Sequence, residues 1–175
     1  SQPPPSAAVA ATAASSDDDA FRAKLQITAG DGATVLPPCF RTFAATPFAS
    51  SVVAALSGAG FSEPTPIQAQ SWPILTAGSD LIAVAKTGSG KTLAFVLPMI
   101  EILARAETPF RKHQVGAVVV SPTRELARQI YDVVVPFLAT VPGLAPPALL
   151  VGGTDASIDA RTFAERGAVT LIGTP

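Results

Sequence analysis

The chain has 175 residues, the size of one domain, and it carries a net charge of -1 with 48% hydrophobic residues and a single cysteine, Cys39. One cysteine excludes an internal disulfide framework, and no run approaches the roughly 18 consecutive apolar residues of a transmembrane helix. The charge excludes a broad basic surface, so any contact with nucleic acid must rely on backbone N–H groups, helix N-termini and a few arginines.

The N-terminal part of the chain lacks the pattern of a folded core. Residues 1–20 are rich in Pro, Ala and Ser and contain the acidic run Asp17–Asp19, a composition typical of disordered segments. Residues 21–39 are expected to be mostly linker, with structure beginning near Phe40. We therefore assign residues 1–41 to a disordered tail and linker.

Two helices are predicted next. Between Ser50 and Ala59 the apolar residues recur at helical spacing, and Gly60 supplies a stop signal. A second helix is predicted from Pro66 to about Leu75, because proline is favoured at the first helical position. A second proline, Pro73, should kink this helix or split off its last turn.

The remainder alternates between two patterns. Continuous apolar runs at 80–84, 115–120, 148–151 and 168–172 predict strands buried on both faces, as in a parallel sheet. Helical patterns lie at 91–105, 123–139 and about 157–165. In the middle helix the predicted apolar stripe consists of Leu126, Ile130, Val134 and Phe137. This alternation predicts an α/β fold with a doubly wound parallel sheet, whose ligands bind beyond the carboxyl ends of the strands.

A glycine-rich loop stands between the run 80–84 and the helical pattern that starts at Lys91. It consists of Ala85, Lys86, Thr87, Gly88, Ser89, Gly90, Lys91 and Thr92. In that context the loop N–H groups and the helix N-terminus converge on nucleotide phosphates, while Lys91 reaches the outer phosphates and the Thr92 hydroxyl ligates Mg²⁺. The alternative is a flexible strand–helix turn, and Ala85 departs from the glycine of the general template.

A second segment has the chemistry for recognising a base. The amide of Gln68 can both donate to and accept from adenine, and Phe61 can stack on a ring. The alternative is a capped helix start in which Phe61 belongs to the core and Gln68 to the surface. The residues alone leave both interpretations open.

These segments together resemble the DEAD-box RNA helicases. Residues 42–69 contain a segment similar to the family's Q motif, with Phe61, Gln68 and the isolated upstream aromatic Phe43. The phosphate loop matches the family's own, which commonly opens with Ala. The resemblance continues through the segments Pro122-Thr123-Arg124-Glu125-Leu126-Ala127, Gly152-Gly153 and Thr174-Pro175, the last being the first half of a Thr-Pro-Gly-Arg motif.

The resemblance implies a RecA-like P-loop NTPase domain, with residues 70–175 forming the N-terminal, truncated part of its ATP-binding domain. It implies ATP and Mg²⁺ as cofactors, adenine contacts from Phe61 and Gln68, and phosphate contacts from Lys91 and Thr92. It also implies RNA contacts that are directed at the backbone and independent of sequence. These RNA contacts would come from Pro122, Thr123, Arg124, Gly152, Gly153, Thr174 and Pro175.

The family's Asp-Glu-Ala-Asp segment does not occur in these residues. We therefore expect the chain to be a fragment, inactive alone because Lys91 and Thr92 are its only catalytic residues. The longer protein is expected to be an RNA helicase that unwinds short duplexes or remodels RNA–protein complexes. We do not expect it to bind a membrane.

Gln114–Ala117 resembles members that act in large-ribosomal-subunit assembly, which favours ribosome biogenesis and an intracellular location in the nucleus or nucleolus. Two alternatives remain open: a non-enzymatic ATP-dependent RNA clamp, and an unrelated P-loop NTPase.

Overall fold

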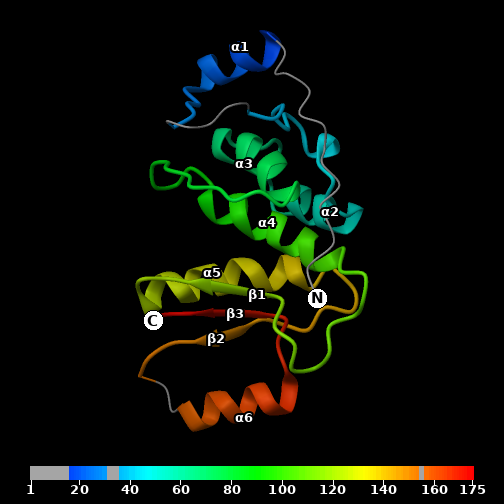
Figure 1. Ribbon diagram of the computed structural model, residues 1–175, viewed down its shortest axis with the longest axis vertical. Coiled ribbons are helices and arrows are strands. Elements are labelled where there is room, and N and C mark those ends of the chain that lie inside the picture. The colour runs from blue at the N-terminus through cyan, green and yellow to red at the C-terminus, as the bar shows by residue number, and fades with distance from the viewer. Residues whose placement is uncertain (1–15, 31–35, 154–155) are drawn as a thin grey trace. The chain divides into compact units, whose positions relative to one another are not determined.

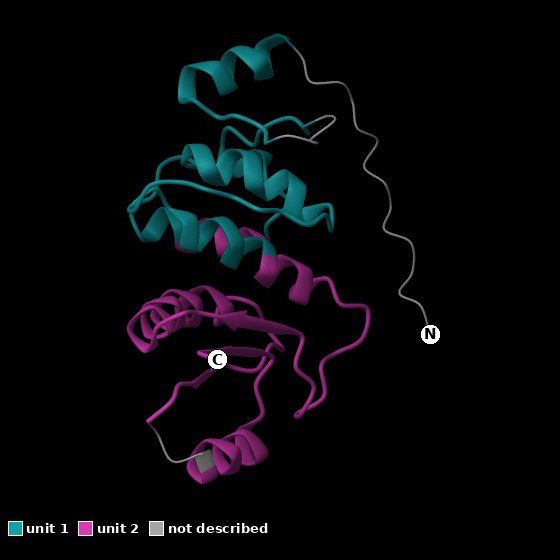
Figure 2. Cartoon of the chain, turned by 60° about the vertical axis from the view of Figure 1, so that its left-hand side comes forward, with its two compact units in different colours: residues 1–48, 56–98 teal, residues 49–55, 99–175 magenta. Residues whose placement is uncertain are grey.

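The computed structural model describes residues 16–30, 36–153 and 156–175 (Figure 1). The chain divides into two compact units (Figure 2). Unit 1 comprises Ser1–Phe48 and Leu56–Pro98, and unit 2 comprises Ala49–Ala55 and Met99–Pro175. No helix among the described residues combines the length and the apolar character that crossing a membrane would require.

Unit 1 is helical and is built around one tryptophan. It contains α1 (Ser16–Leu25), the 3-10 helix η1 (Phe43–Ala45), α3 (Pro66–Thr76) and the first part of α4 (Lys91–Ala104). Trp72 on α3 is fully buried, and its ring meets that of Phe48 edge to face at 5.0 Å. The Trp72 indole N–H donates to the carbonyl of Leu93 on α4 at 3.1 Å, which satisfies the one polar atom of a buried indole.

The N-terminal segment differs from the expected tail and linker. Residues 16–25 form the helix α1, with acidic residues in its first turn and basic residues in its last, the arrangement that the helix dipole favours. This helix buries Asp18 and Arg22 rather than an apolar stripe, so hydrophobic periodicity does not indicate it. Residues 1–15, also expected to be tail, and residues 31–35 lie outside the described residues.

The strand expected at 80–84 is absent, and this expectation was wrong. Residues 81–86 have no regular secondary structure. Ile82 is 96% exposed and Val84 is 94% exposed. A strand requires a neighbour to accept and donate its backbone hydrogen bonds, and no described residue of the chain pairs with this segment. The apolar composition of this run favours a strand, but a strand forms only where a neighbouring strand can pair with it.

The proline inside α3 is accommodated because the carbonyl that it releases has another hydrogen-bond partner. Proline lacks the N–H that would bind the carbonyl four residues earlier. For Pro73 that carbonyl belongs to Ala69, and it accepts a hydrogen bond from the backbone N–H of Phe40 at 2.9 Å. The helix α3 therefore continues to Thr76, without the loss of a last turn that the sequence allowed.

Unit 2 contains a parallel sheet of β1 (Ala117–Val120), β2 (Ala148–Leu150) and β3 (Thr170–Gly173), in the order β1-β3-β2. Strands thus form in the other three apolar runs, with bounds that differ by up to two residues. β1 is not buried on both faces as expected, since Val118 is 64% exposed and Val120 is 68% exposed. The helices α2 (Ser50–Gly58), α4, α5 (Arg124–Leu138) and α6 (Ala156–Arg166) confirm the expected helices within about two residues at each end. Because all three strands run the same way, their carboxyl ends share one edge of the sheet (Figure 1).

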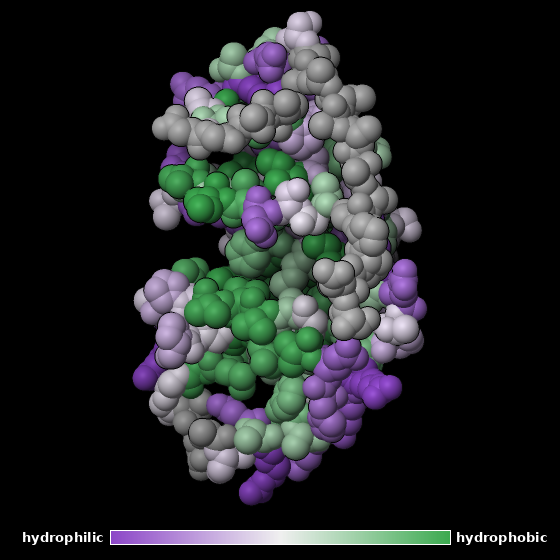
Figure 3. All heavy atoms as spheres, viewed as in Figure 1, coloured by the Kyte–Doolittle hydropathy of each residue, from purple (hydrophilic) through white to green (hydrophobic). Residues whose placement is uncertain are grey.

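The helix α5 packs on β2 and β3 with most of the predicted stripe. Ile130, Val134 and Phe137 are buried, whereas Leu126 is 38% exposed and Ala127 takes the buried position beside it. Further apolar surface remains on each unit (Figure 3). It includes Ile82 and Val84 in unit 1 and the β1 residues Val118 and Val120 in unit 2.

Candidate nucleotide and nucleic-acid sites

The glycine-rich loop lies at the start of α4, as its spacing predicted. Gly88 and Gly90 have φ angles of 75° and 86°, in the left-handed region that favours glycine. Lys91 and Thr92 then form the first turn of α4, so the loop leads directly into a helix N-terminus. This arrangement of backbone N–H groups suits an anion such as a nucleotide phosphate.

The side chain of Lys91 is held within this loop. Its ammonium group donates to the carbonyls of Ala85 at 2.5 Å and Lys86 at 2.6 Å. An ammonium has three N–H donors, so one remains for a phosphate oxygen. The hydroxyl of Ser89 is buried and has no hydrogen-bond partner among the described residues, although a buried hydroxyl normally has one. Both groups fit an oxygen-rich ligand.

Gln68 joins α3 to the loop. Its side-chain carbonyl accepts from the backbone N–H of Thr65 at 3.0 Å, and its NH₂ group donates to the carbonyl of Gly90 at 3.1 Å. The approach is close: a Cβ on Gly90 would lie 2.5 Å from Gln68 Nε2 and 2.9 Å from Thr65 Oγ1. Gly90 is therefore required both for its backbone angle and for this contact.

The hydrogen-bonding capacity of Gln68 is half used. A primary amide offers two acceptor sites and two N–H donors, and one of each is engaged. The remaining pair matches the donor and acceptor that adenine presents. Because Gln68 is only 2% exposed, a base must reach it through a small local movement. The alternative that placed Gln68 on the surface is wrong, because this side chain is buried.

The two aromatic residues of this region have different surroundings. Phe61 is 40% exposed, so its ring is accessible for stacking and does not belong to the core. Phe43 is buried, and its ring centroid lies 6.2 Å from that of Trp72. It supports the position of α3 from within the core of unit 1.

The loop also borders a cavity of about 710 Å³ within unit 1. Its walls come from Ala85, Lys86 and Ser89 of the loop, from the start of α3, from residues 81–84 and from residues 25–30 and 36. The N-terminal segment thus contributes to the surroundings of the loop. Sequence reasoning missed this because it placed residues 1–41 outside the fold.

The other predicted site residues meet at the carboxyl edge of the sheet in unit 2. Pro122, Thr123 and Arg124 follow β1, Gly152 and Gly153 follow β2, and Thr174 and Pro175 follow β3. Backbone hydrogen bonds tie these strand ends together. Ser121 N–H donates to Gly173 O at 2.8 Å, and Thr174 N–H donates to Leu150 O at 3.2 Å.

Arg124 lies against the glycine pair. A Cβ on Gly153 would lie 2.5 Å from Arg124 Nη1, and a Cβ on Gly152 would lie 3.2 Å from Arg124 Nη2. Among the described residues, no acidic side chain lies within ion-pair distance of Arg124. The guanidinium is therefore available to an anion, and the neighbouring backbone of Gly152 and Gly153 has no side chains to block the approach.

The N-terminus of α5 lies at the same place. Thr123 caps the helix, and its hydroxyl oxygen accepts from the backbone N–H of Leu126 at 3.2 Å. The cap leaves the hydroxyl proton available as a donor. A helix N-terminus, an arginine that has no acidic partner among the described residues, and exposed glycine backbone together form a surface suited to phosphate groups.

Comparison with known proteins identifies the family of the chain. The model of the DEAD/DEAH box helicase family matches residues 65–175. The chain is 49% identical to DEAD-box ATP-dependent RNA helicase 18 of Oryza sativa subsp. japonica over 124 residues, which is 71% of this chain and 19% of that protein. It is 43% identical to the ATP-dependent rRNA helicase SPB4 of Chaetomium globosum over 141 residues, which is 69% of this chain and 22% of that protein.

A solved structure supports the fold. The RNA helicase Prp28 from Chaetomium thermophilum, bound to ADP, superposes with a TM-score of 0.70 at 31% identity over 80% of this chain and 33% of that one. The chain spans about a fifth of the length of the curated relatives described above. The family model covers well over half of the chain, and this excludes an unrelated P-loop NTPase. The chain belongs to the DEAD/DEAH box helicase family.

Proposed function

We propose that the protein to which this chain belongs is an ATP-dependent RNA helicase that binds ATP in unit 1 and RNA phosphates at the carboxyl edge of the unit 2 sheet. The observation that carries the proposal is the placement of Arg124 against Gly152 and Gly153. Residues nearly 30 positions apart in the chain form one anion-binding surface there. This surface explains how a chain with a net charge of -1 binds RNA.

In the nucleotide site, the loop N–H groups and Lys91 hold the phosphates, and Gln68 recognises the adenine with its free donor and acceptor. Phe61 supplies an aromatic face for the base. The hydroxyl of Thr92, in the first turn of α4, would hold Mg²⁺, and the ion would supply positive charge beside the phosphates. ATP binds through the groups that Lys91 and Gln68 keep free, because each side chain uses only part of its hydrogen-bonding capacity within the protein.

In the RNA site, Thr123 and Arg124 contact phosphate groups, and the glycine pair lets the RNA backbone approach closely. Pro122, Thr174 and Pro175 complete the edge. Contacts of this kind position a strand without reading its bases. We propose ribosomal RNA as the substrate and the nucleolus as the place of action, because similar proteins are named rRNA helicases.

The two sites can be tested separately in the full-length protein. Lys91→Ala should weaken ATP binding about ten- to hundredfold, since hydrogen bonds to charged groups contribute about 1.5–3 kcal/mol, and should leave RNA affinity unchanged. Lys112→Ala, at an exposed position, is the control. Unchanged ATP affinity in folded Lys91→Ala protein contradicts the nucleotide site.

For RNA, Arg124→Ala should weaken binding of a single-stranded oligonucleotide. It should also reduce the slope of log affinity against log salt concentration by about one unit, as expected for the loss of one phosphate contact. Arg128→Ala, one turn further along the exposed side of α5, should have little effect. Equal effects of the two variants contradict the edge site. RNA-stimulated release of phosphate from ATP supports a helicase, whereas RNA binding without turnover supports the non-enzymatic clamp.

A further inference from the structure

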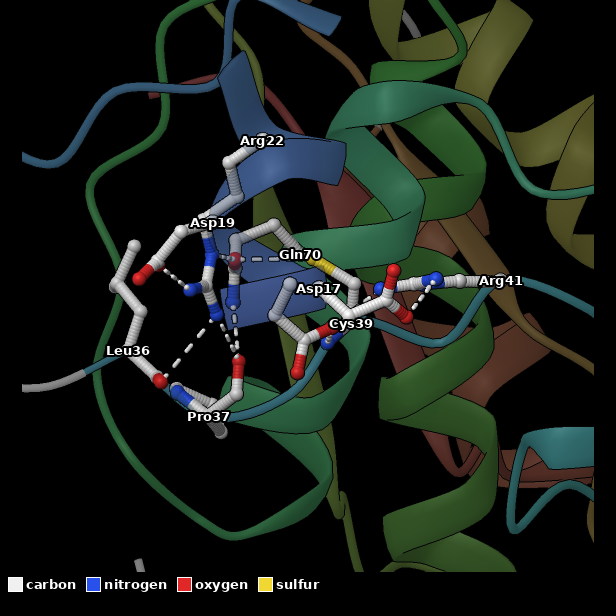
Figure 4. Close-up of polar contacts among 9 residues, drawn as sticks. Asp17, Asp19, Arg22, Leu36, Pro37, Cys39, Arg41 and Gln70 are labelled. Atoms are coloured by element: carbon white, nitrogen blue, oxygen red, sulfur yellow. Dashed lines mark hydrogen bonds and ion pairs between the residues drawn. The ribbon is translucent and has the colours of Figure 1, made fainter. Parts of the chain in front are cut away.

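A network of polar side chains ties α3 to the N-terminal segment, which lies outside the part of the chain that the family model matches. Its centre is Arg22 on α1, which is only 7% exposed. Figure 4 shows Arg22 between Asp19, Gln70 and the carbonyls of Leu36 and Pro37. A buried guanidinium is retained only when its donors are satisfied, so this contact has a defined geometry.

The bonds of Arg22 reach three segments. Its Nε donates to Gln70 Oε1 at 2.8 Å, its Nη1 to Asp19 Oδ1 at 2.9 Å and its Nη2 to Pro37 O at 2.7 Å. The helix α1 and the extended segment 36–41 are thereby fixed to α3 through one side chain. All of these residues lie in unit 1.

Gln70 is the partner on α3, and three of the four hydrogen-bonding sites of its amide are engaged in this network. Its carbonyl accepts from Arg22 and from the Cys39 thiol at 3.2 Å, and its NH₂ group donates to Pro37 O at 3.1 Å. One residue earlier, the carbonyl that Pro73 releases accepts from Phe40 N–H. The segment 36–41 thus contacts α3 through both a side chain and the backbone.

Gln70 follows Gln68 by two positions on the same helix. Residues two apart on an α-helix point about 200° apart, so the two glutamines project to opposite sides of α3. Gln68 reaches the phosphate loop at Gly90 O, while Gln70 reaches Arg22. The first turns of α3 are therefore held from both sides.

We propose that Arg22 and Gln70 are positioning residues for adenine recognition: they hold α3 from the N-terminal side so that the amide of Gln68 faces the base. This inference rests on the proposed ATP site. It assigns to α1 a role in the selectivity for ATP over GTP, although α1 contributes no atom to the nucleotide.

The test uses full-length protein and three ligands: ATP, GTP and tripolyphosphate, which has no base. Arg22→Ala should weaken ATP binding about three- to tenfold and lower the preference for ATP over GTP, while the affinity for tripolyphosphate stays unchanged. Lys24→Ala removes an exposed positive charge from the same helix and should change none of the three affinities. Arg22→Lys, which keeps the charge and the donor to Pro37 O, should restore part of the preference.

A double variant identifies the route of the effect. If Arg22 acts through Gln68, then Arg22→Ala combined with Gln68→Ala should bind ATP no more weakly than Gln68→Ala alone. Additive losses of ATP affinity in the double variant overturn the inference. So does an Arg22→Ala protein that keeps its preference for ATP over GTP, or one whose affinity for tripolyphosphate falls as much as its affinity for ATP. Failure of the proposed ATP site looks different, because the unmutated protein would then bind neither ATP nor tripolyphosphate.

Discussion

Replacing the two loop glycines separately should distinguish backbone strain from contact with Gln68. Both Gly88 and Gly90 have positive φ angles, so an alanine at either costs about 1–2 kcal/mol for the left-handed conformation. Only at Gly90 does the new Cβ meet other atoms, 2.5 Å from Gln68 Nε2, whereas at Gly88 nothing lies within 4 Å. Gly90→Ala must therefore also displace the Gln68 amide.

The displaced amide loses its hydrogen bond to Gly90 O, which contributes about 0.5–1.5 kcal/mol. Gly90→Ala should thus weaken ATP binding roughly two- to tenfold more than Gly88→Ala. Titration of a fluorescent ATP analogue, with GTP as competitor, measures both the affinity and the base preference. Gly88→Ala should lower ATP and GTP affinity in parallel, while Gly90→Ala should also narrow the difference between them. An equal preference in the two variants refutes the role given to Gln68.

Two further predictions follow from single side chains. Gln68→Ala should reduce the ratio of ATP affinity to GTP affinity. In the unmutated protein, GTP leaves polar groups unpaired against the intact amide at a cost of about 1–3 kcal/mol. Equal affinities of the unmutated protein for ATP and GTP contradict this prediction. Burial raises the pKa of the Cys39 thiol, so Cys39 stays protonated at neutral pH and should react with iodoacetamide more slowly in folded than in unfolded protein, as peptide mapping would show. The contribution of this thiol to stability is present below its ordinary pKa and is lost as the pH rises through the raised value.

The fold of unit 2 could be predicted from local pattern because its strands find their partners within it. The runs that became β1, β2 and β3 pair with one another, and α5 packs on β2 and β3. The run 80–84 has an equally apolar composition, yet it has no partner among the described residues and is not a strand. Composition predicts the tendency of a segment to be buried, whereas pairing depends on residues far away in the chain.

The phosphate loop could be predicted because its chemistry depends on neighbouring residues in a short segment. The network of Arg22 could not, since its partner Gln70 is 48 positions away and both side chains are polar. A buried polar contact has no periodic signature. The same holds for Arg124 and Gly153: the resemblance to a family suggested a common role, and only the structure shows that the two residues are neighbours.

The exposed segment 81–84 leads to a last prediction about the 175-residue chain in solution. Ile82 and Val84 are almost completely exposed, and the backbone around them has no regular hydrogen bonding. An unpaired extended segment with apolar side chains is a template for association, and burying one such side chain gains about 1.5–3 kcal/mol. Ile82→Lys should therefore raise the concentration at which the chain begins to scatter light. Ile158→Lys, on α6 where Ile158 is 59% exposed, adds the same charge without touching the segment. An equal gain from both variants shows that net charge, and not the segment 81–84, controls association.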